Sequence, residues 1–323
     1  MKLSSFLIYF ARNFWFWFWR RLMDGFAPSD NKGNYLRPKG ISSDNSFQSE
    51  SIKNKSLFLL VGVTCPWCHR TVIVHKLKNL SKEIPIIYMK GKYETGEWVF
   101  EKEFYKHKTL KSIYKRSNQR NYFRATAPVL ICRKNNQIKI LSNESSEIVR
   151  FLINYQKKEV NFSLSFKDID FKLIELIDQK INNGVYKCGF ARNQESYLNA
   201  SKELFSALKE IDLKIEENKG TWVFGDKISL ADVFLFPTII RWELIYSKLF
   251  KCTEKELSSF KNIMQWRLNF FNLEGISETC MDNQWTKDYY KALFPLNPNQ
   301  IVPIQPCLKE IINQNAASIS KTF

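Results

Sequence analysis

The chain has 323 residues, 44% of them hydrophobic and 15% aromatic, a composition that supports a sizeable folded core and excludes intrinsic disorder. Its formal net charge of +17 favours anionic partners, but the lysines are spread along every segment and no nucleic-acid motif is present, so we expect no nucleic-acid partner. Seven scattered cysteines, an odd number, argue against a disulfide framework and favour a reducing compartment, the cytoplasm.

The segment from Phe6 to Arg21, FLIYFARNFWFWFWRR, is rich in aromatic residues and ends in two arginines. Arg12 interrupts the apolar run well short of the ~20 residues that a membrane span needs, and no signal-peptide cleavage site follows. Two interpretations stay open. The rings pack on their own domain or on a partner subunit, or the segment makes a peripheral membrane contact at headgroup depth. Residues 24–50 are polar and predict a loop or linker.

The run from Leu57 to Arg70, LFLLVGVTCPWCHR, organises the first half of the chain. An apolar stretch of strand length breaks at Thr64, and Pro66 suits the first turn of a helix. This order places Cys65 at a helix N-terminus, where free backbone N–H groups and the helix dipole favour a thiolate and make the cysteine a nucleophile. A C-x-x-C beside a β-α pattern indicates thioredoxin-like redox chemistry.

The same residues allow other interpretations. Cys65 and Cys68 could be two small buried thiols at a helix start. Together with His69 they spell C-x-x-C-H, the motif of haem attachment, but this motif follows a strand with a buried pattern, and few other haem ligands are present. We expect no metal site, because the sequence has no second cysteine pair at ligand spacing and no histidine cluster.

Residues 55–154 predict a compact α/β unit. Its expected elements are a first strand, a helix from Cys65 to about Leu80, a strand over Ile84–Met89, a long polar and aromatic insertion over Lys90–Arg124, a hairpin of Pro128–Arg133 with Ile138–Leu141, and a helix from Ser142 to Phe151. This is the order of a thioredoxin-like domain. Ala127-Pro128 takes the place of the fold's cis-proline, which would aim a backbone edge at whatever binds over Cys65.

A second informative patch, NESSE, covers residues 143–147. A helix N-terminus offers N–H donors to a carboxylate, while a side chain such as Glu144 can hold an ammonium group. A γ-glutamyl moiety carries both of these groups. The alternative is ordinary capping, with Ser142 or Asn143 as the cap and Glu147 completing a capping box.

Beyond residue 158 the pattern becomes helical. Apolar residues recur at spacings of three and four over Phe171–Ile181, Leu198–Ile215 and Leu230–Leu249. Ser229 and Asp232 form a Ser-x-x-Asp cap, which predicts a helix start. The expected fold is an α/β thioredoxin-like N-terminal domain plus an all-α C-terminal domain, the layout of cytosolic glutathione transferases.

From roughly Leu57 to Pro306 the chain resembles the glutathionyl-hydroquinone reductases, the xi class of glutathione transferases, which are also described as omega-like. The motifs that carry this resemblance are CPWCHR at 65–70, FRATAPVL at 123–130, NESSEI at 143–148, INNGVYKCGFA at 181–191, FPTIIRWELIYSKLFKC at 236–252, and YY followed by NPNQIVPIQP near the end. The resemblance implies reduction of glutathionyl-hydroquinones to hydroquinones, with glutathione as co-substrate, no metal, and a homodimer.

The resemblance also implies boundaries and roles. The domains would be an aromatic arm and polar linker (1–54), a thioredoxin-like glutathione-binding domain (55–157), a helical C-terminal domain (158–295) and a tail (296–323). Cys65 would attack the glutathione sulfur and form a mixed disulfide that a second glutathione resolves. The remaining site residues are a proton donor, Tyr186; two tyrosines whose hydroxyls would lower the pKa of Cys65, Tyr246 and Tyr289; and glutathione contacts at Trp98, Arg124, Ala125, Thr126, Ala127, Glu144 and Ser145. Without the family pattern, each tyrosine would be interpreted as a buried ring with a satisfied hydroxyl.

The chain departs from the family pattern in several places. The family usually has alanine at the positions of Cys68 and Cys188, so one thiol suffices and Cys68 is interpreted as a small helix residue. The family's Tyr-Tyr-x-Ser-His ends here in Lys-Ala-Leu, which leaves open whether Tyr289 or Tyr290 belongs to the site. The aromatic arm lies outside the pattern, and the sequence does not identify the physiological quinone.

Two alternative functions remain. A monothiol thioltransferase or dehydroascorbate reductase would share Cys65 but would need no tyrosine as proton donor. A non-catalytic binding module on the same fold would have no need of an activated Cys65, and its thiol would keep an ordinary pKa.

Overall fold

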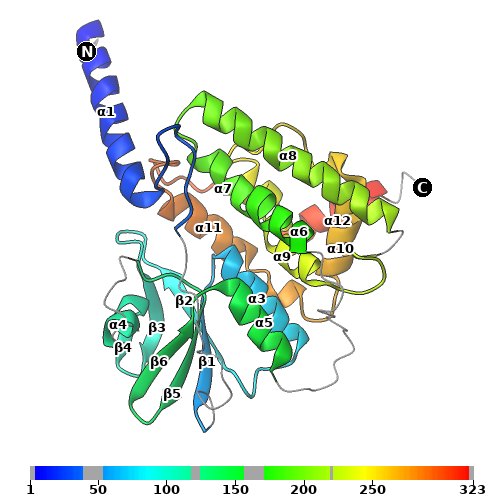
Figure 1. Ribbon diagram of the computed structural model, residues 1–323. Helices are drawn as coiled ribbons and strands as arrows, with labels where there is room; N and C mark the ends of the chain where they lie inside the picture. Colours follow the sequence, from blue (N-terminus) through cyan, green and yellow to red (C-terminus); the bar gives the residue numbers. More distant parts are fainter. Residues whose placement is uncertain (1–3, 39–53, 118–123, 156–170, 219–220, 320–323) are drawn as a thin grey trace.

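The computed structural model describes residues 4–38, 54–117, 124–155, 171–218 and 221–319. A mixed β-sheet and a helical bundle pack side by side, and helix α1 (Ser5–Phe26) projects away from both (Figure 1). The predicted fold, an α/β thioredoxin-like domain followed by an all-helical domain, is confirmed. The expected domain boundary at residues 157 and 158 lies outside the described residues.

The sheet has six strands in the order β4-β3-β2-β1-β5-β6. Strands β1 and β2 run parallel, and the other neighbours pair antiparallel. The strands are β1 (Ser56–Gly62), β2 (Ile86–Gly91), β3 (Trp98–Phe104), β4 (His107–Thr109), β5 (Val129–Lys134) and β6 (Gln137–Ser142). Successive residues of β1 face opposite sides, so Leu59 enters the core shared with the helical domain and Leu60 enters a smaller core under helix α4 (Leu110–Arg116).

The described part of the long insertion predicted after the second strand contains regular secondary structure over residues 98–116. It contains β3, β4 and α4, which extend the sheet beyond β2. Strands β3 and β4 pair with one another across a tight turn at Tyr105 and Lys106, and β3 pairs with β2. Their stability comes from this pairing, which short-range sequence patterns do not reveal. The predicted strand over Ile84–Met89 is shifted and runs over Ile86–Gly91.

Helices α3 (Pro66–Leu77) and α5 (Ser145–Asn154) lie between the sheet and the helical bundle (Figure 1). The bundle contains α6 (Phe171–Leu176), the π-helical η1 (Ile177–Asn182), α7 (Asn183–Phe190), α8 (Gln194–Glu217), α9 (Leu230–Ile239), the π-helical η2 (Trp242–Tyr246), α10 (Lys261–Phe271), α11 (Asp282–Ala292) and α12 (Leu308–Ile319), with short 3-10 turns at Leu257–Ser259 and Ser277–Thr279. The capping box of Ser229 and Asp232 at the start of α9 is confirmed.

The single helix predicted over Leu230–Leu249 is wrong in its second half. Helix α9 ends at Ile239, and the chain continues as η2 from Trp242. Pro237 lies in the last turn of α9, where its missing N–H removes one helical hydrogen bond. The break turns Arg241 inward, and its side chain is completely buried.

The polar segment after α1 follows the helical domain as a loop. The amide of Arg192 donates to the Gly33 carbonyl at 3.1 Å, and the Ser196 hydroxyl donates to the Lys32 carbonyl at 2.7 Å. Gly33 has a φ of +87°, and a Cβ there would collide with Asn193. These contacts fix the path of residues 27–38 along the start of α8 and bring Arg37 to the site described below.

Candidate active site

Cys65 is the N-cap residue of α3, as the sequence predicts. Its backbone is extended (φ −72°, ψ 121°), Pro66 opens the helix, and its amide donates to the Gly62 carbonyl at 3.1 Å. The thiol is partly exposed and lies 3.6 Å from the carbonyl oxygen of Ala127, whose peptide bond to Pro128 is cis. The expected backbone edge over Cys65 is therefore present.

The pKa of Cys65 is lowered to about 6. The largest cause is a hydrogen bond from the Cys68 thiol, and the backbone N–H groups of Cys68 and Trp67 and the positive charge of Arg37 add to it, while burial opposes it. Burial and the neighbouring Cys65 raise the pKa of Cys68 well above its usual range. At neutral pH the pair is thus one thiolate, Cys65, and one thiol, Cys68.

The three predicted tyrosines meet, although they come from three different elements. The hydroxyl of Tyr289 in α11 lies 2.6 Å from that of Tyr186 in α7 and 3.3 Å from that of Tyr246 in η2. The ring of Tyr186 packs 5.0 Å from the ring of Trp67, two residues beyond Cys65. Burial raises the pKa of all three hydroxyls, and the charge of Cys65 raises the pKa of Tyr186 and Tyr289 further, so the cluster is protonated at neutral pH.

The hydrogen bonds of the tyrosines differ in part from those expected from the sequence. Tyr246 and Tyr289 were expected to donate to the Cys65 thiolate, but their hydroxyls bond within the tyrosine cluster, and Cys68 supplies the hydrogen bond that lowers the pKa of Cys65. Of the neighbouring pair in α11, Tyr289 is the residue in the cluster. The buried hydroxyl of Tyr290 has no hydrogen-bond partner within the described part of the chain.

The start of α5 forms the opposite wall of the site. Glu144 is its N-cap residue and its side chain makes no capping hydrogen bond, while the buried hydroxyl of Ser145 has no partner among the described residues. Ser142 bonds to Glu147 and to the Glu144 amide, so the predicted capping box is only partly formed. The first N–H groups of an α-helix have no carbonyl partner within the helix, so the start of α5 offers a place for an anionic ligand.

Glu144 is a carboxylate placed between acidic and basic neighbours. Burial raises the pKa of Glu144, whereas the positive charges of Arg37 and Arg70 lower it. The Arg70 side chain is buried and pairs with Asp178 at 2.9 Å. The site therefore presents helix N–H groups and a carboxylate side by side.

The remaining predicted glutathione contacts occupy different places. Trp98 begins β3, and its ring covers Gly62, where a Cβ would lie 2.5 Å from the ring. Thr126 is held by Tyr114, which donates to its carbonyl, and by Asn143, which donates to its hydroxyl, both at 2.9 Å. Ala125 packs beside the smaller core.

Arg124 turns away from this network. It is exposed and donates to the Phe26 carbonyl at the end of α1, at 3.3 Å. The structure therefore brings together the predicted residues around Cys65 and α5, and it places the Arg124 side chain against the N-terminal helix.

Two residues of the site were missed by the sequence analysis. The guanidinium carbon of Arg37 lies 3.2 Å from the ring centroid of Trp67, and its charge favours the Cys65 thiolate. Asp288 in α11 accepts hydrogen bonds from Thr64, the residue before Cys65, and from Tyr93 at 2.7 Å. Arg37 stands in a polar stretch that predicts only a loop, and no local signal distinguishes it from other arginines.

His69 is part of the structural core. One ring nitrogen lies 2.8 Å from the Thr279 hydroxyl and the other 2.9 Å from the Arg241 guanidinium. Burial and the charge of Arg241 lower the pKa of His69 well below its usual range. Both nitrogens are thus engaged within the protein, which argues against the haem-attachment interpretation.

The comparisons with known proteins agree with this geometry. Residues 64–154 match the glutathione S-transferase N-terminal domain family, and residues 149–274 match the glutathione S-transferase C-terminal domain family. The chain is 30% identical over 291 residues to glutathionyl-hydroquinone reductase YqjG of Escherichia coli, covering 84% of this chain and 86% of the relative.

Solved structures show the same likeness. The glutathione-bound structure of Escherichia coli YqjG aligns with a TM-score of 0.70 at 30% identity, over 79% of this chain and 85% of that one. The xi glutathione S-transferase of Phanerochaete chrysosporium aligns with a TM-score of 0.78 at 26% identity, over 86% of this chain and 94% of that one. The chain belongs to the glutathione transferase family, in its xi class.

Proposed function

We propose that this protein reduces glutathionyl-hydroquinones to hydroquinones, with glutathione as co-substrate and oxidised glutathione as the second product. The observation that carries the proposal is the tyrosine cluster beside Cys65. Disulfide exchange requires only a thiolate, whereas cleavage of an aromatic thioether also requires a proton for the leaving carbon. Cys65 supplies the thiolate, and Tyr186 supplies a hydroxyl that burial keeps protonated.

In the first half-reaction, the Cys65 thiolate attacks the glutathione sulfur of the substrate. A Cys65–glutathione disulfide forms as the bond between that sulfur and the aromatic ring breaks, and the bonding electron pair goes to the ring carbon. Tyr186 protonates this carbon, and Tyr289, 2.6 Å away, donates a hydrogen bond to the resulting phenolate. In the second half-reaction, the thiol of another glutathione attacks the glutathione sulfur of the mixed disulfide and its proton returns to the phenolate of the tyrosine cluster. Oxidised glutathione leaves, and Cys65 is restored as a thiolate.

Glutathione binding is supported by the geometry of α5 and by the family. We infer that the N–H groups and Ser145 hydroxyl at the start of α5 hold the γ-glutamyl carboxylate, and that Glu144 holds the ammonium group. The backbone at Ala127 would pair with the cysteinyl part of the tripeptide. The Escherichia coli relative has been solved with glutathione bound.

The decisive experiment compares two reactions in the same variants. Hydroquinone release from a glutathionyl-hydroquinone is measured by chromatography, and glutathione adduct formation from oxidised glutathione is measured by mass spectrometry. Cys65→Ala should abolish both. Tyr186→Phe should lower hydroquinone release about 10²–10⁴-fold, the usual contribution of a general acid, and leave adduct formation nearly unchanged. Tyr290→Phe removes a neighbouring buried hydroxyl outside the cluster and serves as the matched control.

Retention of full hydroquinone release by Tyr186→Phe would contradict the proposed mechanism. An adduct formed readily from oxidised glutathione, with no hydroquinone release in the unmodified protein, would instead identify a monothiol thioltransferase or dehydroascorbate reductase. The lowered pKa of Cys65 counts against a non-catalytic binding module, for which an ordinary thiol would serve.

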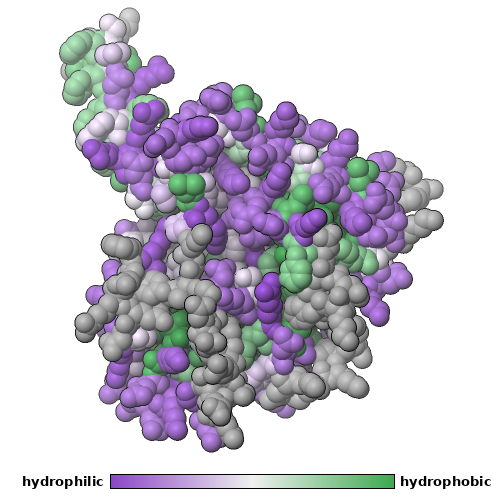
Figure 2. All heavy atoms as spheres, viewed as in Figure 1, coloured by the Kyte–Doolittle hydropathy of each residue, from purple (hydrophilic) through white to green (hydrophobic). Residues whose placement is uncertain are grey.

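We further propose that α1 contacts an anionic phospholipid surface. The aromatic side chains between Phe6 and Phe18 are 40–73% exposed. Met23 is the only buried residue of the helix. The interpretation in which this segment packs on its own domain therefore fails for these turns. Figure 2 shows hydrophobic side chains gathered along the projecting helix. Within the described residues, no helix is both long enough and apolar enough to cross a membrane.

The charge of α1 selects the partner surface. Arg12, Arg20 and Arg21 accompany the rings, and the guanidinium of Arg20 lies 4.5 Å from the ring centroid of Phe16. The first acidic side chain of the helix is Asp24, at its base. Exposed aromatic rings beside cations suit the headgroup region of an anionic membrane.

Two further expectations complete the proposal. Every cysteine of the chain is a free thiol in the structure, which supports work in a reducing compartment, the cytoplasm. The homodimer implied by the family resemblance stays a prediction, which size-exclusion chromatography with light scattering checks.

A further inference from the structure

Cys65 and Cys68 form a dithiol pair in the first turn of α3. Residues three apart on a helix lie on the same face, and the thiol of Cys68 donates a hydrogen bond to the sulfur of Cys65. The two side chains are therefore neighbours, and both residues bond to Gly62, whose carbonyl accepts from the Cys65 amide at 3.1 Å and whose amide donates to the Cys68 sulfur. Cys65 is partly exposed, while Cys68 is 1% exposed and is a free thiol. This is the arrangement of an outer attacking sulfur backed by an inner one.

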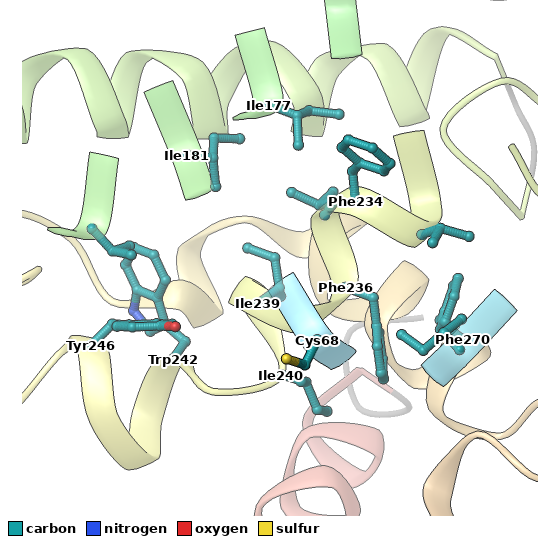
Figure 3. Packing of buried hydrophobic residues seen from close by; sticks show 14 of the residues in the cluster. Cys68, Ile177, Ile181, Phe234, Phe236, Ile239, Ile240, Trp242, Tyr246 and Phe270 are labelled. Carbon is teal, nitrogen blue, oxygen red and sulfur yellow. The ribbon is translucent and has the colours of Figure 1, made fainter. Parts of the chain in front are cut away.

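Cys68 has polar neighbours that a small residue filling space in the core would not need. The amide of Gly62, at the end of β1, donates to the Cys68 sulfur at 3.2 Å. Figure 3 shows Cys68 near Ile239, the last residue of α9, and Ile240, the residue after it. The buried guanidinium of Arg241, the next residue, has no acidic partner within the described part of the chain, and its positive charge favours a thiolate at Cys68. The N–H donor and the cation thus oppose in part the burial and the Cys65 charge that raise the pKa of this thiol, and once glutathione occupies Cys65 the Cys65 charge is gone.

We propose that Cys68 is a resolving thiol that displaces glutathione from Cys65 and closes a Cys65–Cys68 disulfide when free glutathione is scarce. This inference rests on the proposed function, because it begins with the glutathione adduct on Cys65. It goes beyond the single-thiol mechanism implied by the family, in which this position is usually alanine.

The step balances without an added oxidant. The Cys68 sulfur attacks the Cys65 sulfur of the mixed disulfide, the Cys65–glutathione bond breaks as the Cys65–Cys68 bond forms, and the Cys68 proton leaves on the glutathione thiol. From the first attack to closure of the disulfide, two electrons pass from the cysteine pair to the glutathionyl-hydroquinone. The pair is left as a disulfide, and the conjugate is reduced to free hydroquinone and glutathione. Two molecules of glutathione later reduce the disulfide and leave as oxidised glutathione.

The dithiol would set the resting state of the enzyme. At high glutathione, the second glutathione competes with Cys68 for the adduct, so resolution of the adduct does not require Cys68. At low glutathione, the disulfide keeps Cys65 from irreversible oxidation, because a disulfide is reversible whereas sulfinic and sulfonic acids are not. One glutathione is also returned to solution for each molecule of hydroquinone formed.

The test uses the full-length reduced protein and a glutathionyl-hydroquinone without free glutathione. After an acid quench, intact mass and peptide mapping identify the state of each thiol, and released glutathione is quantified. The unmodified protein should lose two hydrogens, link Cys65 to Cys68 and release one glutathione per chain. Cys68→Ala and Cys68→Ser should instead retain one glutathione on Cys65. Cys132→Ala, which removes a buried thiol in β5, is the matched control and should behave as the unmodified protein.

A stable glutathione adduct on Cys65 of the unmodified protein, equal to that of Cys68→Ala, would overturn the proposal. A parallel incubation with oxidised glutathione separates this failure from failure of the proposed function, because it loads Cys65 by disulfide exchange alone. A Cys65–Cys68 disulfide formed from oxidised glutathione but not from the hydroquinone conjugate would support the resolving thiol and contradict the reductase activity. A glutathione adduct on Cys65 that persists with both substrates would support the reductase activity and would show that Cys68 does not act as a resolving thiol.

Discussion

Cys65 becomes a thiolate through contacts that arise within a few residues of it. The hydrogen bond from the Cys68 thiol, three residues away, has the largest effect on the pKa of Cys65. The other causes that lower this pKa are, in order, the backbone N–H of Cys68, the charge of Arg37 and the N–H of Trp67. Only Arg37 is distant in the sequence. The reactive state of the cysteine is thus largely a property of the first turn of α3 and its N-terminal position.

The pH dependence of Cys65 alkylation follows from this lowered pKa. The thiolate reacts, so the rate of alkylation by iodoacetamide should rise with pH, with a midpoint at about 6, and level off at neutral pH. At pH 7 a pKa of about 6 leaves roughly nine-tenths of the group as thiolate, against a few per cent for an ordinary cysteine. Cys68→Ala removes the largest favourable contact and should move the midpoint upward.

The measurement is best made in a Cys307→Ser background, because Cys307 is the exposed thiol that would react in parallel. Cys65→Ser in the same background gives the rate of the remaining cysteines. A midpoint near the ordinary cysteine value, unchanged by Cys68→Ala, would contradict the proposed activation. Cys68→Ala should nevertheless keep most hydroquinone release at high glutathione, where Cys68 is not needed for resolution.

Helix α11 connects the two domains at the active site. Trp285, Asp288 and Tyr289 recur at helical spacing and so lie on one face. The indole of Trp285 donates to the Val63 carbonyl at 3.0 Å, Asp288 accepts from the Thr64 hydroxyl, and Tyr289 enters the tyrosine cluster. A single helix of the second domain thereby holds the turn before Cys65 and supplies one member of the tyrosine cluster.

Asp288→Asn tests this connection. An amide has only one acceptor oxygen, so it cannot serve both the Thr64 and Tyr93 hydroxyls as the carboxylate does. We expect the free energy of unfolding to fall by about 1–3 kcal/mol, the usual cost of an unsatisfied buried polar group. Hydroquinone release should fall as well, since the turn that positions Cys65 loosens.

Denaturant unfolding and kcat/KM measure the two effects. Asp226→Asn, at an exposed position in the turn before α9, removes a charge without touching the site and is the control. Unchanged unfolding and kcat/KM in Asp288→Asn would show that α11 does not position the Val63–Thr64 turn.

At the scale of the whole molecule, α1 is anchored at its base and exposed along its length. The indole of Trp19 donates to the Pro295 carbonyl at 2.9 Å, and Arg192 bonds both to Asp24 and to the Ala27 carbonyl. These contacts fix the helix to the body of the protein, from which it projects (Figure 1). The arrangement would hold the active site close to the surface that α1 contacts.

Binding to liposomes tests the membrane contact. Full-length protein should sediment at low salt with vesicles containing phosphatidylglycerol, and much less with phosphatidylcholine vesicles, because the arginines require anionic lipid. Trp15→Ser combined with Trp17→Ser should remove binding at any salt concentration, and Arg20→Gln combined with Arg21→Gln should remove mainly its salt-sensitive part. Lys134→Gln, an exposed cation at the end of β5 and far from the arm (Figure 1), serves as the charge control.

Indifference to anionic vesicles at low salt would contradict the membrane proposal. If the two tryptophan substitutions instead changed the oligomeric state measured by light scattering, the exposed face of α1 would belong to a contact between copies of the chain. The hydroquinone-releasing activity in solution should be the same for the arm variants and the unmodified protein, because α1 does not line the tyrosine cluster.

Sequence patterns succeeded where structure is decided by near neighbours. The β1–α3 junction, the helix starts at Cys65 and Ser229, and the β5–β6 hairpin follow from hydrophobic periodicity, proline placement and capping residues. They failed for β3 and β4, because β3 depends on pairing with β2 and β4 on pairing with β3, and for the end of α9, where Arg241 turns into the core.

The sequence by itself determined the reactive element of this protein, because an N-cap cysteine, a following proline and a second thiol three residues later act within one helical turn. The family resemblance named the three tyrosines, but only the tertiary structure decided that their hydroxyls bond to one another. Along the chain, Tyr246 lies 43 residues and Tyr186 lies 103 residues before Tyr289. The stacking of Arg37 on Trp67 was likewise decided by packing. Local patterns set backbone conformation, whereas distant side chains meet only when the elements that carry them pack together.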